Sequence, residues 1–170
     1  MIRARKTLLA MGAALALIGA SAVVRSDPFL VWNASASVPI GLYALTPITQ
    51  PGIGDLVAVR PPEPLGRWLV ENGYLGPETP LLKRVTAVPG SEVCRLGTTI
   101  IIDGDAVAEA QLRDRLGRPL PVWRGCRTLR DGEFFLLNAD HLGSLDGRYF
   151  GPLDTSTVIG RATPIWTREG

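Results

Sequence analysis

The sequence predicts a mostly β domain that follows an apolar N-terminal segment, and three observations support this. Apolar and β-branched residues occur in short runs bounded by Gly, Pro or Asp, which is typical of strands joined by turns. The 170 residues include 19 Gly and 14 Pro, so turns are frequent. The length suits one domain, and a hydrophobic content of 46% is enough for a buried core.

Six runs have the pattern of strands, and one has the pattern of a helix. A helix is predicted over Leu65–Asn72, because Pro64 suits a first turn and Gly73 a helix end. Residues 113–121 are charged and rich in Gly and Pro, which favours an exposed loop. The predicted strands are Ile40–Thr46, Asp55–Arg60, Leu81–Val88, Thr98–Asp103, Ala106–Glu109 and Phe134–Asn138, the fourth and fifth forming a hairpin.

The N-terminus has the features of an export or anchoring signal. Three basic residues precede an uncharged apolar run over Leu8–Val24. Its 17 residues are at the short end of the range for a transmembrane helix, about 17–25. Because positive charge stays in the cytoplasm, the rest of the chain is expected on the far side of the membrane. We therefore expect a leader and membrane-anchor helix over residues 1–26 and an extracytoplasmic β domain over residues 27–170.

Two features of the N-terminal region leave alternatives open. The small residues Ala20, Ser21 and Ala22 would also suit cleavage, which would release a soluble periplasmic protein. The apolar stretch Phe29–Trp32 could lie in the membrane interface or continue the core.

Charge and cysteine content exclude several classes of function. The net charge is only +2, and charges of both signs are scattered, which argues against nucleic acid as a partner. The two cysteines, Cys94 and Cys126, lack a nearby His cluster and make a poor metal site. In an exported domain we expect them to form a disulfide, with two buried free thiols as the alternative. No metal or organic cofactor is indicated.

The most informative residue for chemistry is Lys83, since the chain has 16 Arg but only two Lys, and the other, Lys6, is in the leader. Arg cannot give up its proton at working pH, whereas a buried Lys can become a neutral amine. Lys83 follows two leucines in the apolar run Leu81–Val88, which suits a buried general base. The alternative is an ordinary lysine on the solvated surface. With His141 the single histidine, a Ser-His-Asp site is disfavoured.

Three sequence blocks together resemble the boxes of the type I signal peptidase family of Ser-Lys proteases. They are Asn33–Tyr43, Leu82–Gly90 and Gly143–Pro152, in this order. The SxPxGxY form of the first block and the DGRYFGP form of the third resemble the TraF-type signal peptidases of conjugative transfer more than the housekeeping enzymes. The resemblance implies a signal-peptidase-like β domain with an N-terminal transmembrane helix.

The resemblance also implies roles for individual residues. Ser37 matches the nucleophile and Lys83 the general base. Ser35 matches a hydroxyl that helps the Ser37 N–H form the oxyanion hole, and Ser144 matches a serine that orients the lysine amine.

A structural ion pair is implied beneath these residues, between Asp146 and Arg148. Relatives usually carry Ser between this Asp and Arg, whereas this chain has Gly147.

The implied function is a membrane-anchored endopeptidase that removes leader peptides from exported proteins. Its expected partners are the membrane, a pilin precursor and the conjugative transfer machinery, with either hydrolysis or pilin cyclisation as the outcome. The alternatives are a housekeeping signal peptidase and a non-enzymatic component of an envelope secretion complex. The leader and the lack of a DNA-binding region argue against a self-cleaving repressor protease, which also uses Ser and Lys.

Overall fold

The computed structural model describes residue 7, residues 11–16 and residues 29–168. Residues 11–16 are helical, but most of the predicted anchor lies outside the described residues. Within the described part of the chain, no helix has the length and apolar character needed to cross a membrane.

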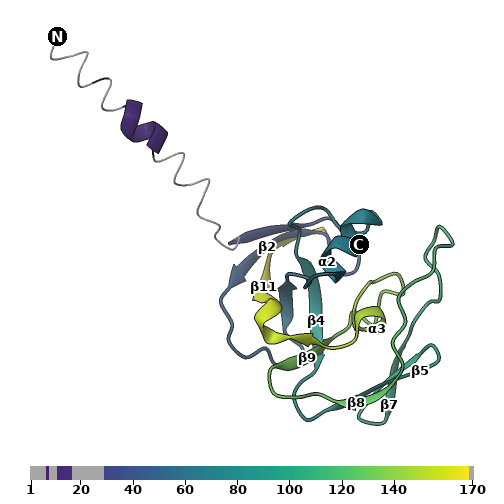
Figure 1. Ribbon diagram of the computed structural model, residues 1–170. Helices are drawn as coiled ribbons and strands as arrows, with labels where there is room; N and C mark the ends of the chain where they lie inside the picture. The colour runs from purple at the N-terminus through teal and green to yellow at the C-terminus, as the bar shows by residue number, and fades with distance from the viewer. Residues whose placement is uncertain (1–6, 8–10, 17–28, 169–170) are drawn as a thin grey trace.

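The described domain consists mainly of antiparallel strands with three short helices (Figure 1). In chain order, the elements are β1 (Leu30–Asn33), β2 (Gly41–Thr46), β3 (Leu56–Val59), α2 (Leu65–Glu71), β4 (Leu81–Ala87), β5 (Glu92–Leu96), β6 (Thr99–Ile102), β7 (Asp105–Glu109), β8 (Gly125–Thr128), β9 (Glu133–Leu136), α3 (Gly147–Phe150), β10 (Leu153–Asp154), the 3-10 helix η1 (Thr155–Thr157) and β11 (Val158–Thr167).

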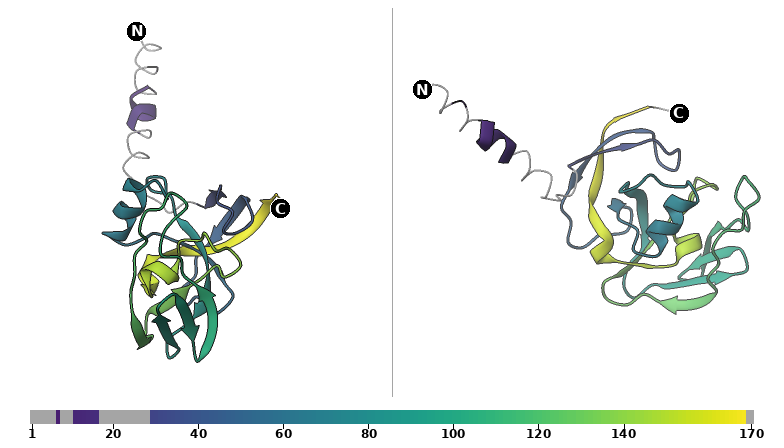
Figure 2. Two further views of the ribbon diagram at one scale, coloured as in Figure 1. Left: turned by 90° about the vertical axis from the view of Figure 1, so that its right-hand side faces the viewer. Right: turned by 45° about the horizontal axis from the view of Figure 1, so that its top comes forward.

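The strands form two sheets. The large sheet has seven strands in the order β1-β2-β11-β3-β4-β9-β10, and the small sheet has four in the order β7-β6-β5-β8. Every pairing between these strands is antiparallel. Figures 1 and 2 show the small sheet at one end of the domain, away from β2.

All six predicted strands and the predicted helix are confirmed, with ends that differ by at most two residues. The longest strand of the described residues, β11, was not predicted, because Gly160 and Pro164 interrupt its pattern. Both residues are accommodated locally. A Cβ at position 160 would lie 2.7 Å from the Thr46 carbonyl oxygen, and the register with β2 shifts between Pro164 and Trp166. Strands β1, β5, β8 and β10 and helix α3 were also not predicted.

The core is divided between the faces of the large sheet and the junction with the small sheet. One cluster joins the two sheets through Val93 and Ile100 of the small sheet and Ala87 and Phe135 of the large one, all fully buried. Because burial of apolar surface is the main favourable term in folding, this cluster holds the small sheet against β4 and β9.

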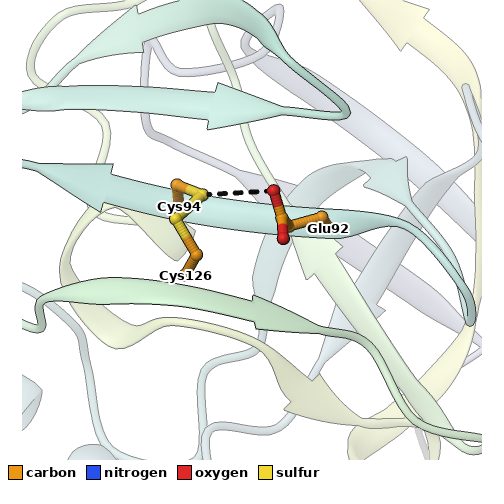
Figure 3. A group of neighbouring side chains, drawn as sticks. All are labelled: Glu92, Cys94 and Cys126. Atoms are coloured by element: carbon orange, nitrogen blue, oxygen red, sulfur yellow. Dashed lines mark hydrogen bonds between the residues drawn. A yellow bond between two sulfur atoms is a disulfide. The ribbon is translucent and has the colours of Figure 1, made fainter.

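The cysteines lie opposite each other on β5 and β8 and form the predicted disulfide, with an S–S distance of 2.02 Å (Figure 3). The bond closes a loop with a sequence separation of 32. Residues 113–121 are mostly exposed, as predicted, but they are also anchored. Tyr74 donates to Asp114 at 2.6 Å, and Leu120 is buried.

Candidate active site

Lys83 lies in the middle of β4, and its side chain is 4% exposed. Alternation along the strand puts Lys83 and Arg84 on opposite faces, and Arg84 is exposed. Lys83 pairs with the fully buried Val57 of β3 and shares its face with Val85, which is also fully buried. The lysine is therefore not a solvated surface residue.

Two hydroxyl groups lie within hydrogen-bond distance of the Lys83 amine. Its Nζ is 3.1 Å from Ser37 Oγ and 2.9 Å from Ser144 Oγ. Ser37 lies in the turn between β1 and β2, 46 positions before Lys83 in the sequence. Ser144 lies in the loop before α3, 61 positions after Lys83, so two distant segments contact the same amine. The structure thus brings together three of the residues predicted from sequence.

The surroundings of Lys83 favour its neutral form. Burial lowers the pKa of Lys83 to about 8, because desolvation penalises the charged ammonium. The Asp146 carboxylate opposes this by raising the pKa, and the Arg148 guanidinium lowers it. A substantial fraction of the amine is therefore unprotonated near pH 8, with a lone pair that can accept the Ser37 proton.

The predicted Ser35 also lies next to Ser37. The two side-chain oxygens are 3.1 Å apart. Ser35 Oγ donates to Asn33 Oδ1 at 2.9 Å, so in this arrangement its own oxygen is left to accept from Ser37. Donation from Ser35 to a substrate oxygen requires its hydroxyl to rotate away from Asn33.

The predicted pair of Asp146 and Arg148 is fully buried and bidentate. Arg148 Nε donates to Asp146 Oδ1, and Nη2 donates to Oδ2, each at 2.9 Å. Asp146 is also the N-cap of α3 and accepts from the Arg148 main-chain N–H. Arg148 Nη2 reaches the main-chain oxygen of Ser144 at 3.2 Å, which connects the pair to the loop that carries this hydroxyl.

Gly147 stands where the family usually has Ser, and the structure gives a steric reason. A Cβ at this position would lie 2.6 Å from both the Leu136 carbonyl oxygen and the Phe135 ring. Such a distance requires backbone or core movement. In this chain the site therefore has no space for a side chain at position 147.

Sequence reasoning missed two buried asparagines at the site, Asn33 and Asn138. An Asn just before a Ser-rich turn could have suggested Asn33, since Asn side chains bond to nearby main chain in turns. Asn138 follows β9 and had no comparable signal, because it bonds to a strand 54 to 56 positions earlier.

His141 does not take the position of a base next to Ser37. Its Nδ1 is buried and has no hydrogen-bond partner in the described part of the chain. Its main-chain oxygen accepts from Arg148 Nη2 at 2.8 Å. The residue therefore contributes to the support of the ion pair through its backbone.

Glu92, Cys94 and Cys126 form a cluster that resembles a metal site in composition (Figure 3). The two sulfurs are bonded to each other, so neither is a thiolate that could bind a metal. Glu92 Oε1 lies 3.7 Å from Cys94 Sγ, a contact with a sulfur that has no proton to donate. The donor set therefore does not fit a metal ion while the disulfide is intact.

On a mostly β fold, a buried lysine is thus in contact with two serine hydroxyls that come from distant parts of the sequence. The chain belongs to the family of the signal peptidases, peptidase S26, whose model matches residues 4–167.

Among curated proteins, the chain is 34% identical to the conjugal transfer protein TraF of Agrobacterium fabrum, covering 91% of this chain and 92% of the relative. It is 32% identical to the plasmid transfer protein TraF of Escherichia coli, covering 92% and 91%. The resemblance to the TraF-type subgroup is thus confirmed. A signal peptidase I of Enterococcus faecalis aligns with a TM-score of 0.41 and 22% identity, over 69% of this chain and all of that structure.

Proposed function

We propose that the chain is a membrane-anchored serine endopeptidase in which Ser37 is the nucleophile and Lys83 the general base. The observation that carries this proposal is the buried amine 3.1 Å from the Ser37 hydroxyl, with a pKa lowered to about 8. A serine hydroxyl is a weak nucleophile until a positioned base takes its proton, and a neutral lysine can do so. Membership in a peptidase family supports the same chemistry.

The reaction follows from this geometry. Ser37 Oγ attacks the scissile carbonyl carbon while its proton passes to Lys83 Nζ. The tetrahedral intermediate collapses to an acyl-enzyme, and the Lys83 ammonium gives the proton to the leaving amine. Lys83 is then neutral again and takes a proton from the second nucleophile, which attacks the Ser37 ester. The second tetrahedral intermediate collapses, the bond from the acyl carbon to Ser37 Oγ breaks, and the Lys83 ammonium returns the proton to Ser37 Oγ as the product leaves.

Three further groups support these steps. Ser144 holds the amine through its hydroxyl at 2.9 Å. The Ser37 main-chain N–H and the Ser35 hydroxyl, once rotated, stabilise the negative charge that develops on the substrate oxygen. The buried pair of Asp146 and Arg148 fixes the loop of Ser144 and balances charge near Lys83.

The substrate is the leader peptide of an exported protein, and the conjugal and plasmid transfer relatives favour a pilin precursor. Water is one possible second nucleophile, which gives a cleaved pilin. The amino group of the pilin itself is the other, which gives a cyclic pilin. Mass analysis of the processed product separates the two outcomes, because hydrolysis adds the mass of one water relative to the cyclic form.

The proposed location is the inner membrane, with residues 1–26 as a single-pass anchor and residues 27–170 in the periplasm. Five exposed apolar side chains of the region around β1 and the end of β11 support this placement. Trp32 and Trp166 stack with ring centroids 5.8 Å apart. Trp is favoured at membrane interfaces. The five side chains, called the aromatic surface below, are Phe29, Leu30, Trp32, Ile165 and Trp166, each more than half exposed.

The test is processing of a pilin precursor by the full chain with Ser37→Ala or Lys83→Arg. Loss of a triad-type residue costs on the order of 10⁴-fold or more in turnover. Lys83→Arg keeps the charge but removes the base, so we expect the same loss. Ser156→Ala, at an exposed serine, and Lys6→Arg, at the second lysine, are matched controls with full activity. Full activity of either site variant would disprove the proposed dyad.

A further inference from the structure

The turn that carries Ser37 and the strand that carries Lys83 are each held by a buried asparagine. Asn33 is 7% exposed and Asn138 is 5% exposed. Burial of an amide costs free energy unless its hydrogen bonds are made, and both residues use their donor and acceptor ends. We propose that Asn33 and Asn138 are positioning residues that fix the Ser37 hydroxyl and the Lys83 amine relative to each other. This inference rests on the proposed function.

Asn138 bonds to the main chain on both sides of Lys83. Its Oδ1 accepts from the Arg84 N–H at 3.0 Å, and its Nδ2 donates to the Leu82 carbonyl at 3.2 Å. The main-chain bonds between β9 and β4 end with Leu137 N–H and the Arg84 carbonyl, at 2.9 Å. The side-chain amide therefore extends the pairing to the residues that flank the lysine, where the backbone of β9 no longer does so.

The main chain of Asn138 connects the same strand to the buried ion pair. Its N–H donates to Asp146 Oδ2 at 3.1 Å, and its carbonyl accepts from Arg148 Nη2 at 3.3 Å. Arg148 Nη2 also bonds to the carbonyl of Ser144. One residue thus sets the position of β4 relative to the loop that supplies the second hydroxyl to the lysine.

Asn33 does for Ser37 what Asn138 does for Lys83. Its Oδ1 accepts from the main-chain N–H of Ser35 at 3.1 Å and from its hydroxyl at 2.9 Å. Its Nδ2 lies 3.1 Å from the carbonyl oxygens of both Val38 and Pro39. These contacts are on the two sides of Ser37 in sequence, so the amide closes the turn around the nucleophile.

A positioning role has a consequence that a purely structural role lacks. Displacement of reacting groups by about 1 Å can cost on the order of 100-fold in rate. Loss of either amide removes the bonds that hold one partner of the 3.1 Å contact between Ser37 and Lys83. The rate at each correctly folded site then falls, whereas a purely structural loss lowers only the number of folded sites.

The experiment uses the full chain in detergent and the ester N-acetyl-alanine p-nitrophenyl ester, which acylates an activated serine. The variants are Asn33→Ala and Asn138→Ala, with Asn72→Ala as control, since Asn72 Nδ2 makes one comparable bond to the Trp68 carbonyl at the end of α2. The burst of nitrophenolate counts active sites, and its rate constant reports acylation. We expect each test variant to acylate about 10- to 100-fold more slowly per site, and the control to match the parent chain.

Two further arms make the outcome decisive. If an Ala variant does not fold, Asn33→Asp and Asn138→Asp keep the size and the acceptor but lose the donor, and we expect about a tenfold slower rate per site. Parental rates per site in the folded Asn variants, with Ser37→Ala unreactive, would overturn this inference alone. If Ser37→Ala is acylated like the parent chain, the proposed function itself fails.

Discussion

Buried charged side chains have different partners in the two sheets. In and beside the large sheet, the buried Arg148 has a carboxylate partner, and the buried Lys83 has two hydroxyls and a lowered pKa. In the small sheet, Arg95 is 1% exposed and bonds only to main-chain oxygens, and its Nη2 has no partner in the described part of the chain. The ionisable groups of the candidate site thus lie in the large sheet or beside it at α3, while the small sheet contains a buried arginine without a carboxylate partner.

The acceptors of Arg95 explain why the buried cation matters. Its Nη1 donates to the main-chain oxygens of Arg148 and Pro121, and its guanidinium carbon lies 5.9 Å from the centroid of the Tyr149 ring. Arg95 therefore attaches the small sheet to α3 through the main-chain oxygen of Arg148. Its neighbour Cys94 adds a covalent link to β8. The comparison indicates that the small sheet supports the site without contributing reacting groups.

The largest expected effect is loss of the buried ion pair in Asp146→Asn. This leaves the fully buried Arg148 without a counter-charge, which costs about 3–5 kcal/mol of unfolding free energy. The control is Asp55→Asn, whose partner Arg161 is half exposed, and an exposed pair contributes about 0–1 kcal/mol. Urea unfolding measures both. If both variants lost the same unfolding free energy, the buried pair would contribute no more than the exposed one, which would contradict this expectation.

The disulfide tests whether the small sheet acts only on stability. The double variant Cys94→Ser and Cys126→Ser removes a bond between residues separated by 32 positions in sequence, and the chain-entropy model gives such a loop closure about 3–4 kcal/mol. We expect that loss in unfolding free energy, with unchanged turnover per folded molecule. Intact mass without reductant should show both thiols of the parent chain blocked. A drop in turnover per folded molecule would show that the influence of the small sheet reaches the chemistry.

Part of this arrangement was predictable from local patterns and part only from a family resemblance. Alternation along Leu81–Val88 placed Lys83 and Arg84 on opposite faces. The resemblance of three sequence blocks to the signal peptidases indicated that Ser37 and Ser144 lie near Lys83. The structure places the hydroxyls of Ser37 and Ser144 each within 3.1 Å of the Lys83 amine.

The remainder depends on register and close packing between distant segments, which local patterns do not encode. Asn138 meets β4 because pairing between β4 and β9 ends one residue earlier. Gly160 in β11 reads as a turn residue, yet it is needed where the strand passes the Thr46 carbonyl. The sequence around Arg95 gives no signal that separates it from the other arginines, and only the position of α3 shows why it is buried.

The pH dependence tests the lowered pKa on the large sheet. In the proposed mechanism acylation requires neutral Lys83, and burial lowers the pKa of this residue to about 8. The rate should therefore rise about tenfold per pH unit below 8 and level off above it. In Ser144→Ala the Lys83 amine loses one of its two hydroxyl partners, so the maximal rate should fall. The control is Ser91→Ala, just before β5, which should keep the parental pH profile. A midpoint well below 8 would show that a group other than Lys83 controls the rate.

The smallest expected effect concerns the aromatic surface. This surface lies at β1 and β11 of the large sheet, and the proposal gives no membrane contact to the small sheet. The chain has four Trp, so the double variant Trp32→Phe and Trp166→Phe removes the exposed pair. In vesicles with lipids brominated near the headgroup, we expect quenching of tryptophan fluorescence in the parent chain and its loss in this variant.

The control is Trp68→Phe and Trp123→Phe together, at two partly buried positions, which should retain the quenching. Processing of a membrane-bound precursor should slow by a few-fold, on the order of 1 kcal/mol, because the phenyl rings still bury apolar area. Parental chain that shows no quenching would place this surface away from the bilayer.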